Sequence, residues 1–343
     1  MEKQAVRNPV FDVMKGIGII LMLIGHIPPG DQVYHFIYSF HMPLFFIVAG
    51  LFANTIHSDK DWLLMFRKDA LRLILPVVIT MAFVILLSPL HYVTDKNFNH
   101  VVCEVLSLFW SGDALGTKWG VLNSPMWFLI SLFWTRVLFR CVEFIGWRQH
   151  KRHDEIVLLM SIGLAYLAVV LHGFLPFPTP LGILKGITAL SFYSIGWYVK
   201  KHKMPILCVL VLFWLLALKY GGIDMYKYRY SCFPIDVLGA AGATWLIYLL
   251  CKGICRVAPK TSVLLQWFGV NSLLIFCVHC FDRRTYFVKA VKGVIELVFN
   301  TEIVGYSSVI LHYSIEMIMV VAITFIPLFK RIYGARRLKE IIN

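Results

Sequence analysis

Two residues of the first apolar segment, Lys15 and His26, combine side-chain types and a spacing that could do chemistry. They lie eleven residues apart in FDVMKGIGIILMLIGH, close to three helical turns, so both share one helix face, about 16 Å apart along the axis. Together they could hold a charged carrier near a proton-accepting imidazole. The structural alternative has Lys15 reaching the membrane surface and His26 capping the helix beside Pro28.

His41 lies near the start of the next apolar segment, FIYSFHMPLFFIVAGLF. A short hairpin between the two segments would place His26 and His41 at similar depth. Two imidazoles there could act as general bases or bind an anion. The alternative for His41 is a hydrogen bond to a backbone carbonyl that Pro43 leaves without a partner.

Other ionisable side chains fall toward the same side of the predicted bundle. An ionisable group at membrane depth costs about 2.5–3.5 kcal/mol on insertion scales, so each is a functional candidate. They are His172, Lys185, Asp236, His279, His312 and Glu316. Glu316 follows His312 by one helical turn and could orient a histidine or hold a proton. Its alternative role is an ion pair with Lys185 or Arg136.

A compact basic group, Arg67, Lys68 and Arg72, precedes Pro76 on the opposite side. Such a group suits phosphate binding, and it equally suits ordinary anchoring at the inner membrane surface. Cys277 and Cys280 flank His279 with a spacing that resembles a metal motif. Zinc needs about four ligands, and a second pair is not evident in the sequence, so we predict no metal.

The elements that must position these residues are membrane helices. The chain has 343 residues, of which 59% are hydrophobic and 15% charged, whereas soluble domains carry roughly 25% charged residues. Apolar runs of spanning length recur throughout. The predicted spans are 10–29, 35–53, 71–90, 126–146, 156–173, 181–199, 204–219, 235–251, 263–281 and 307–330. We predict an all-α polytopic membrane protein of about ten transmembrane helices, with residues 1–343 forming a single domain and no appended soluble domain.

The net charge of +14 resides in short loops, which indicates topology and not nucleic-acid binding. Lys and Arg favour one set of alternating loops by roughly two to one. This bias predicts that both termini face the cytoplasm. The first segment lacks a small-residue cleavage site, so we expect it to be a retained helix in a multi-pass protein of the cytoplasmic (inner) membrane.

Six segments, in order, resemble the membrane-bound acyltransferase 3 family. They are FDVMKGIGIILMLIGH, FHMPLFFIVAGLF, LRLILP, SPMWFL, FYSIGWYVKK and WFGVNSLLIFCVHC, and they cover nearly the whole chain. The resemblance assigns Lys15 and His26 to the opening motif, Arg72 and Pro76 to an R-x-x-x-P segment, and His279 to the last motif. One departure is Asp69, where many members carry arginine.

This resemblance implies a membrane-bound O-acyltransferase that uses acetyl-CoA to acylate a cell-surface glycan or its lipid-linked saccharide precursor, within membrane lipid. We expect Lys15, Arg67, Lys68 and Arg72 to bind the acyl-CoA phosphates. His26 would be the base or acyl carrier, tuned by His41 and Glu316. The residues expected to contact the acceptor are His279, Trp127 and Asp236.

Two other functions are compatible with polar groups at two depths. A transporter or exporter of a polar solute or polysaccharide would line its path with them, although no inverted repeat is evident in the sequence. A non-catalytic subunit of an envelope polysaccharide machine would need none of them for chemistry. Replacing His26 separates these functions, because only the enzyme depends on its imidazole.

Overall fold

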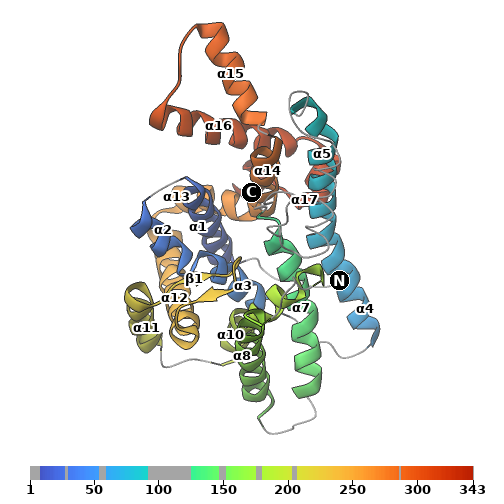
Figure 1. The fold of residues 1–343 in the computed structure, drawn as a ribbon, viewed down its shortest axis with the longest axis vertical. Coiled ribbons are helices and arrows are strands. Elements are labelled where there is room, and N and C mark those ends of the chain that lie inside the picture. The colour runs from blue at the N-terminus through green and yellow to red at the C-terminus, as the bar shows by residue number, and fades with distance from the viewer. Residues whose placement is uncertain are drawn as a thin grey trace.

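The computed structural model describes residues 8–27, 30–53, 59–91, 125–146, 152–174, 180–202, 207–285 and 287–342, and these ranges are mainly helical (Figure 1). The first half contains α1 (Pro9–His26), α2 (Asp31–Tyr38), α3 (His41–Leu51), α4 (Asp59–Asp69), η1 (Ala70–Ile74), α5 (Leu75–His91), α7 (Trp127–Gly146) and α8 (His153–His172). The second half contains η2 (Pro180–Gly182), α9 (Ile183–Thr188), α10 (Leu190–Lys201), α11 (Leu207–Tyr220), β1 (Ile223–Asp224), β2 (Arg229–Tyr230), α12 (Phe233–Val257), α13 (Pro259–Val270), α14 (Ser272–Thr285), α15 (Phe287–Phe299), α16 (Gly305–Ile323), α17 (Pro327–Tyr333) and α18 (Lys339–Ile342).

Each predicted span contains a helix, but not every one of these helices is long and apolar enough to cross a membrane. By length and apolar composition, six helices in the described ranges could cross a membrane, or seven if the bent pair α13 and α14 forms one span. α7 carries Arg136, Arg140 and Glu143 within its length, and α11 is short, with 14 residues. A span count of ten and the cytoplasmic placement of the termini remain predictions. Pro28, invoked in the structural alternative for His26, lies outside the described residues.

Large apolar side chains cover the outside of the bundle. Leu159 on α8, Leu212 on α11 and Ile318 on α16 each expose more than half of their surface. A water-soluble monomer rarely exposes contiguous apolar surface on this scale. Because lipid tails solvate such side chains well, the exposed faces are consistent with a multi-pass membrane protein.

Two glycines set the position of α1 against α13. A Cβ at Gly16 would collide with the carbonyl of Leu265, and a Cβ at Gly269 would collide with the carbonyl of Asp12. Small residues at a crossing let two membrane helices approach closely. The chain then bends by 60° between α13 and α14. At this bend the Asn271 side chain donates to the Trp267 carbonyl and accepts from the Arg336 backbone N–H. The bend directs α14 toward the end of α1.

The helical pair α15 and α16 lies at one end of the bundle, with α16 beside α14 (Figure 1). Of the described residues of α16, Glu316 and Val320 are buried. Two polar contacts attach this helix to α14, from Glu316 to His279 and from His312 to Asp282.

A short hairpin joins α11 to α12. Its strands β1 and β2 pair antiparallel, with Ile223 opposite Tyr230. The Asp236 carboxylate, in the first turn of α12, accepts from the backbone N–H groups of Gly222 and Cys232, at 2.9 and 3.0 Å. These two hydrogen bonds fix both ends of the hairpin to α12.

Candidate active site

A chain of three side chains from three helices joins His26 to the interior. His26 is the last residue of α1, and its Nδ1 lies 3.0 Å from Nε2 of His279 on α14. The other nitrogen of His279, Nδ1, lies 3.0 Å from Oε1 of Glu316 on α16. His279 and Glu316 are almost completely buried, with side-chain exposures of 2% and 0%. The sequence could not reveal this arrangement, because 253 residues separate the two histidines.

The direction of these hydrogen bonds follows from the carboxylate. An ionised Glu316 can only accept, so Nδ1 of His279 carries a proton, and the neutral ring has its lone pair at Nε2. Nε2 of His279 therefore accepts from Nδ1–H of His26. The lone pair of His26 is then at its own Nε2. This tautomer is the one that a general base requires.

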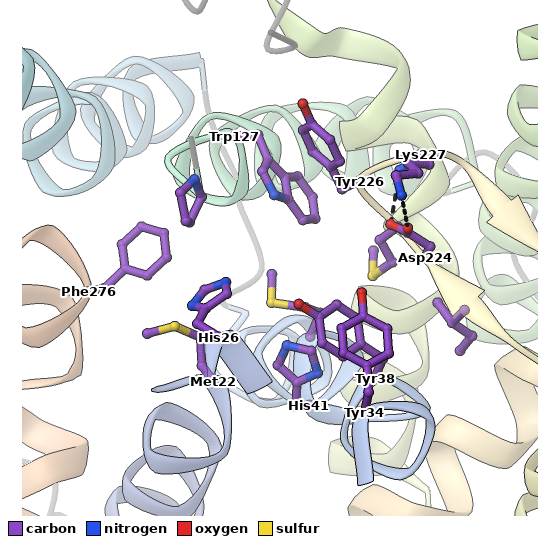
Figure 2. Close-up of a pocket in the computed structure, with 14 residues that line it drawn as sticks. Met22, His26, Tyr34, Tyr38, His41, Trp127, Asp224, Tyr226, Lys227 and Phe276 are labelled. Atoms are coloured by element: carbon purple, nitrogen blue, oxygen red, sulfur yellow. Dashed lines mark hydrogen bonds and ion pairs between the residues drawn. The ribbon is translucent and has the colours of Figure 1, made fainter. Parts of the chain in front are cut away.

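A cavity of about 130 Å³ lies beside His26, with room for a group of several heavy atoms. Figure 2 shows that its labelled walls come from α1, α2, α3, α7, α14 and the β1–β2 hairpin. The lining residues are Met22, His26, Tyr34, Tyr38, His41, Met42, Pro125, Trp127, Ile223, Asp224, Met225, Tyr226, Lys227 and Phe276. Aromatic walls with a few polar groups are typical of small-molecule sites.

His41 lines the same cavity as His26, although its hydrogen bond is to the backbone. Its Nδ1 lies 2.9 Å from the carbonyl of Ile37, at the break between α2 and α3. The carbonyl can only accept, so Nδ1 carries the proton and Nε2 the lone pair. His41 therefore does bond to a backbone carbonyl, but not to one that Pro43 leaves without a donor, since the Ile37 carbonyl also accepts from the Phe40 N–H. The bond orients the imidazole in the cavity wall.

Trp127 contributes to the cavity wall and also to the packing around Lys185. The Nζ of Lys185 lies 4.2 Å from the ring centre of Tyr226 and 5.3 Å from that of Trp127. Lys185 is buried, with 1% exposure. Ring faces attract a cation, so this contact stiffens the wall formed by α7, α9 and the hairpin.

Asp236 does not line the cavity beside His26, and its two oxygens accept the backbone bonds that hold the hairpin. The predicted contact between this residue and an acceptor therefore finds no support in the geometry. A carboxylate at this position satisfies backbone donors that would otherwise be buried without partners.

The predicted partners of Glu316 were Lys185 or Arg136, and the structure places both elsewhere. Arg136 donates from Nε to Asp69, at 2.8 Å. Glu316 instead contacts His279 and, one turn away on α16, His312, whose Nε2 lies 3.4 Å from Oε1. The same nitrogen of His312 lies 3.1 Å from the Asp282 carboxylate.

A cation could be held by Asp282, His312 and Glu316, whose potential ligand atoms all lie within 4.8 Å of one another. In the structure, hydrogen bonds from His312 join these groups. Cys277 and Cys280, which suggested a metal motif in the sequence, are both buried in α14 and are not part of this group.

The basic residues predicted to bind the donor lie away from the cavity. Lys15 forms an ion pair with Asp12, at 2.7 Å, and does not line the cavity beside His26. Arg67 and Lys68 are exposed at the end of α4, and Arg72 is exposed within η1. The η1 segment is a π-helical turn, and such turns are frequent at functional sites. This geometry favours a functional role for Arg72.

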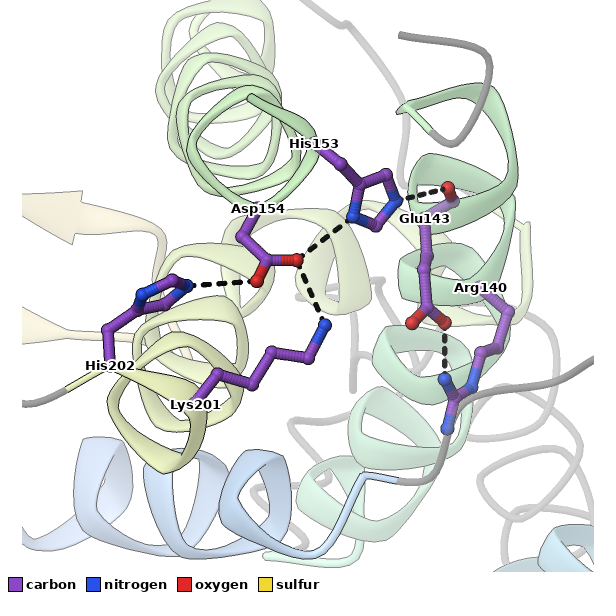
Figure 3. Close-up of polar contacts among 6 residues, drawn as sticks. All are labelled: Arg140, Glu143, His153, Asp154, Lys201 and His202. Carbon is purple, nitrogen blue, oxygen red and sulfur yellow. Dashed lines mark hydrogen bonds and ion pairs between the residues drawn. The ribbon is translucent and has the colours of Figure 1, made fainter. Parts of the chain in front are cut away.

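A second polar network lies among α7, α8 and α10 (Figure 3). Asp154 accepts from Lys201, and it also contacts His153 and His202, with each of the three distances 2.9 Å. Arg140 pairs with Glu143 on α7. This network joins the helix ends, and none of its members lines the cavity beside His26.

Sequence reasoning missed three features of the candidate site. It did not identify Asp282, it left His312 without a role beyond bonding Glu316, and it did not name the aromatic residues Tyr34, Tyr38 and Tyr226. The spacing of four between His312 and Glu316 was an available signal for the pair. The aromatic wall depends on the hairpin folding back over α1, which local patterns do not encode.

One comparison with known proteins identifies a match. A family model of the acyltransferase 3 type, described as an acyltransferase domain, matches residues 8–329. This range includes His26, His279, Glu316 and the whole cavity wall. The searches of curated proteins and of solved structures find no match.

Proposed function

The chain belongs to the acyltransferase 3 family, and from this premise we propose that it transfers an acyl group from a cytoplasmic acyl-CoA to an acceptor hydroxyl. The acyl group in this proposal is acetyl. The acceptor is a cell-surface glycan or its lipid-linked precursor. The membrane would be the cytoplasmic (inner) membrane. The observation that supports this proposal most strongly is the contact of His26 with His279 and Glu316 at the edge of an aromatic cavity.

His26 would act as the general base. Its Nε2 takes the proton of the acceptor hydroxyl while the hydroxyl oxygen attacks the thioester carbonyl carbon. The carbon–sulfur bond then breaks, and the departing thiolate takes up the proton. The positive charge that develops on His26 is stabilised through His279 by the buried Glu316 carboxylate.

The aromatic cavity would bind the acceptor. Trp127 and Tyr226 form one wall, and Tyr34 and Tyr38, whose rings stack at 3.8 Å, form another. Flat rings of this kind offer apolar faces to the C–H surface of a sugar, while His41 and the Asp224–Lys227 pair offer polar groups to its hydroxyls. His26 at the edge would then meet a hydroxyl of the bound ring.

The donor would enter from the side of Lys15, Arg67, Lys68 and Arg72, whose cations suit phosphates. Lys15 lies about 16 Å from His26 along α1, from the helical rise of their eleven-residue separation. A thioester on a long flexible arm can cover such a distance. The cation of Lys15 already has Asp12 as a partner, so its contact with a phosphate would require that pair to open.

Inverted membrane vesicles test this function directly. We expect label from radioactive acetyl-CoA to appear on the glycan or lipid-linked saccharide, and His26→Ala to abolish it without loss of the inserted protein. His202→Ala is the matched control, since it also removes an imidazole bonded to a carboxylate, Asp154, away from the cavity. Solute movement without acetyl-CoA would indicate a transporter, and full function of His26→Ala would indicate an assembly subunit.

A further inference from the structure

Beyond Glu316, the hydrogen-bonded chain that begins at His26 continues to two residues that the proposed mechanism does not use. Nε2 of His312 lies 3.1 Å from the Asp282 carboxylate and 3.4 Å from Oε1 of Glu316. Oε1 of Glu316 is also the closer oxygen to His279. A single imidazole nitrogen therefore bridges two carboxylates, one of which contacts the histidine pair.

The two carboxylates are buried close together. Asp282 has 2% exposure and Glu316 has 0%, whereas the His312 side chain has 34%. Two carboxylates this close repel each other unless a donor lies between them or one of them binds a proton. The N–H of His312 supplies that donor.

Each carboxylate has a second task that fixes its position. Oδ1 of Asp282 accepts from the backbone N–H of Val288 at the start of α15, at 2.7 Å. Glu316 accepts from His279. On the neighbouring turn of α16, Ser308 accepts from Lys292 of α15, which also pairs with Glu296. Among the side chains that the structure describes, the charged groups in contact with His312 are Asp282 from α14 and Glu316 from α16, and Lys292 with Glu296 joins α15 to α16 one turn away.

We propose that His312 is a positioning residue that keeps Glu316 an acceptor toward His279 despite the neighbouring Asp282 carboxylate. This proposal rests on the role of His26 under the proposed function. The direction of the hydrogen bonds from Glu316 to His26 decides which nitrogen of His26 carries the proton. If Glu316 bound a proton, it could donate to His279, whose Nδ1 would then hold the lone pair and whose Nε2–H would donate to His26. The Nε2 of neutral His26 would carry the proton, and the base would be lost.

The test compares turnover in three variants. His312→Leu removes the bridge and should lower kcat for acetyl transfer roughly tenfold or more, as loss of supporting groups around a site commonly does, with KM for both substrates unchanged. His312→Gln keeps an N–H donor and should retain most of the activity. The double variant Asp282→Asn with His312→Leu should recover most of the lost kcat, because Glu316 then has no second carboxylate beside it.

Recovery through a second substitution separates this proposal from a merely structural role for His312. Lys292→Met is the control for loosening of the α15–α16 pair, and it should leave kcat near the wild-type value. Wild-type turnover in His312→Leu, or a double variant no better than the single one, would overturn the proposal. Loss of activity on chelation with recovery on added zinc would also overturn it, since the three groups would then hold a cation.

The proposal can fail while the proposed function stands. If His26→Ala abolishes transfer and His312→Leu does not lower it, the base is correct and the positioning role is wrong. If His26→Ala transfers acetyl like the wild type, the proposed function itself fails.

Discussion

His26 and His279 lie 3.0 Å apart through their ring nitrogens, and their rings are nearly parallel, with an interplanar angle of 13°. One ring ends α1 and the other lies on α14. The glycine crossing of α1 with α13 and the bend before α14 bring them together. The two histidines therefore depend on helix packing as much as on their own chemistry.

Replacing Glu316 with glutamine tests the direction of the hydrogen bonds. The amide of Glu316→Gln has nearly the size of the carboxylate but can donate, so it no longer fixes the tautomer of His279. We expect kcat for acetyl transfer to fall about 10²- to 10⁴-fold, the range for general base catalysis, with KM little changed. Single-turnover rates in detergent would measure this, and wild-type kcat would contradict the proposed role of Glu316.

The close approach of α1 and α13 can be tested at Gly269. A methyl group in Gly269→Ala would collide with the Asp12 carbonyl, and overpacking of this kind costs about 1–3 kcal/mol. We expect a lower thermal unfolding temperature and loss of transfer, because α14 would move away from His26. Gly253→Ala on α12 is the control, since a Cβ there meets nothing within 4 Å and alanine favours a helix. Equal unfolding temperatures for both variants would refute the packing argument.

The helical fold was largely predictable from the sequence, because apolar runs of spanning length are typical of membrane helices. Each predicted span contains a helix, and the bends within several of them were not foreseen. His41, for example, follows a break between α2 and α3 inside one predicted span. Breaks of this type depend on local contacts, such as the bond from His41 to the Ile37 carbonyl, and hydropathy does not register them.

Some members of the candidate site could be singled out from the sequence, but their arrangement could not. His26, His279 and Glu316 stood out because ionisable groups are rare in apolar segments. Their pairing could not be derived, since it depends on which helices are neighbours across the bundle. Asp69 illustrates the same limit: its partner Arg136 is on α7, 67 residues away.

Trp127 should affect acceptor binding more than turnover. Removing its ring in Trp127→Ala deletes part of the cavity wall, and an aromatic contact is worth about 0.5–1.5 kcal/mol. We expect KM for the acceptor to rise up to about tenfold while KM for acetyl-CoA stays constant. Trp245→Ala is the matched control, because Trp245 stacks on Tyr248 in α12 and does not line the cavity. A rise in the KM for acetyl-CoA alone would instead indicate that Trp127 contacts the donor.

Arg72 should act on the donor. A hydrogen bond to a charged group contributes about 1.5–3 kcal/mol, so Arg72→Ala should raise KM for acetyl-CoA about tenfold or more without changing acceptor KM. The difference from wild type should shrink at high salt, which screens exposed charges. Arg229→Ala, an exposed arginine on the hairpin strand β2, is the control. Unchanged donor KM in Arg72→Ala would remove this residue from the donor site.

Chemical rescue of His26→Ala tests the base most directly, because it restores the imidazole without the rest of the side chain. In vesicles supplied with acetyl-CoA and acceptor, the variant should be inactive alone, and added imidazole should restore transfer in proportion to its concentration. The same imidazole should not restore Gly269→Ala, in which the packing and not the base is damaged. Full transfer by His26→Ala without imidazole would contradict the assignment of His26 as the base.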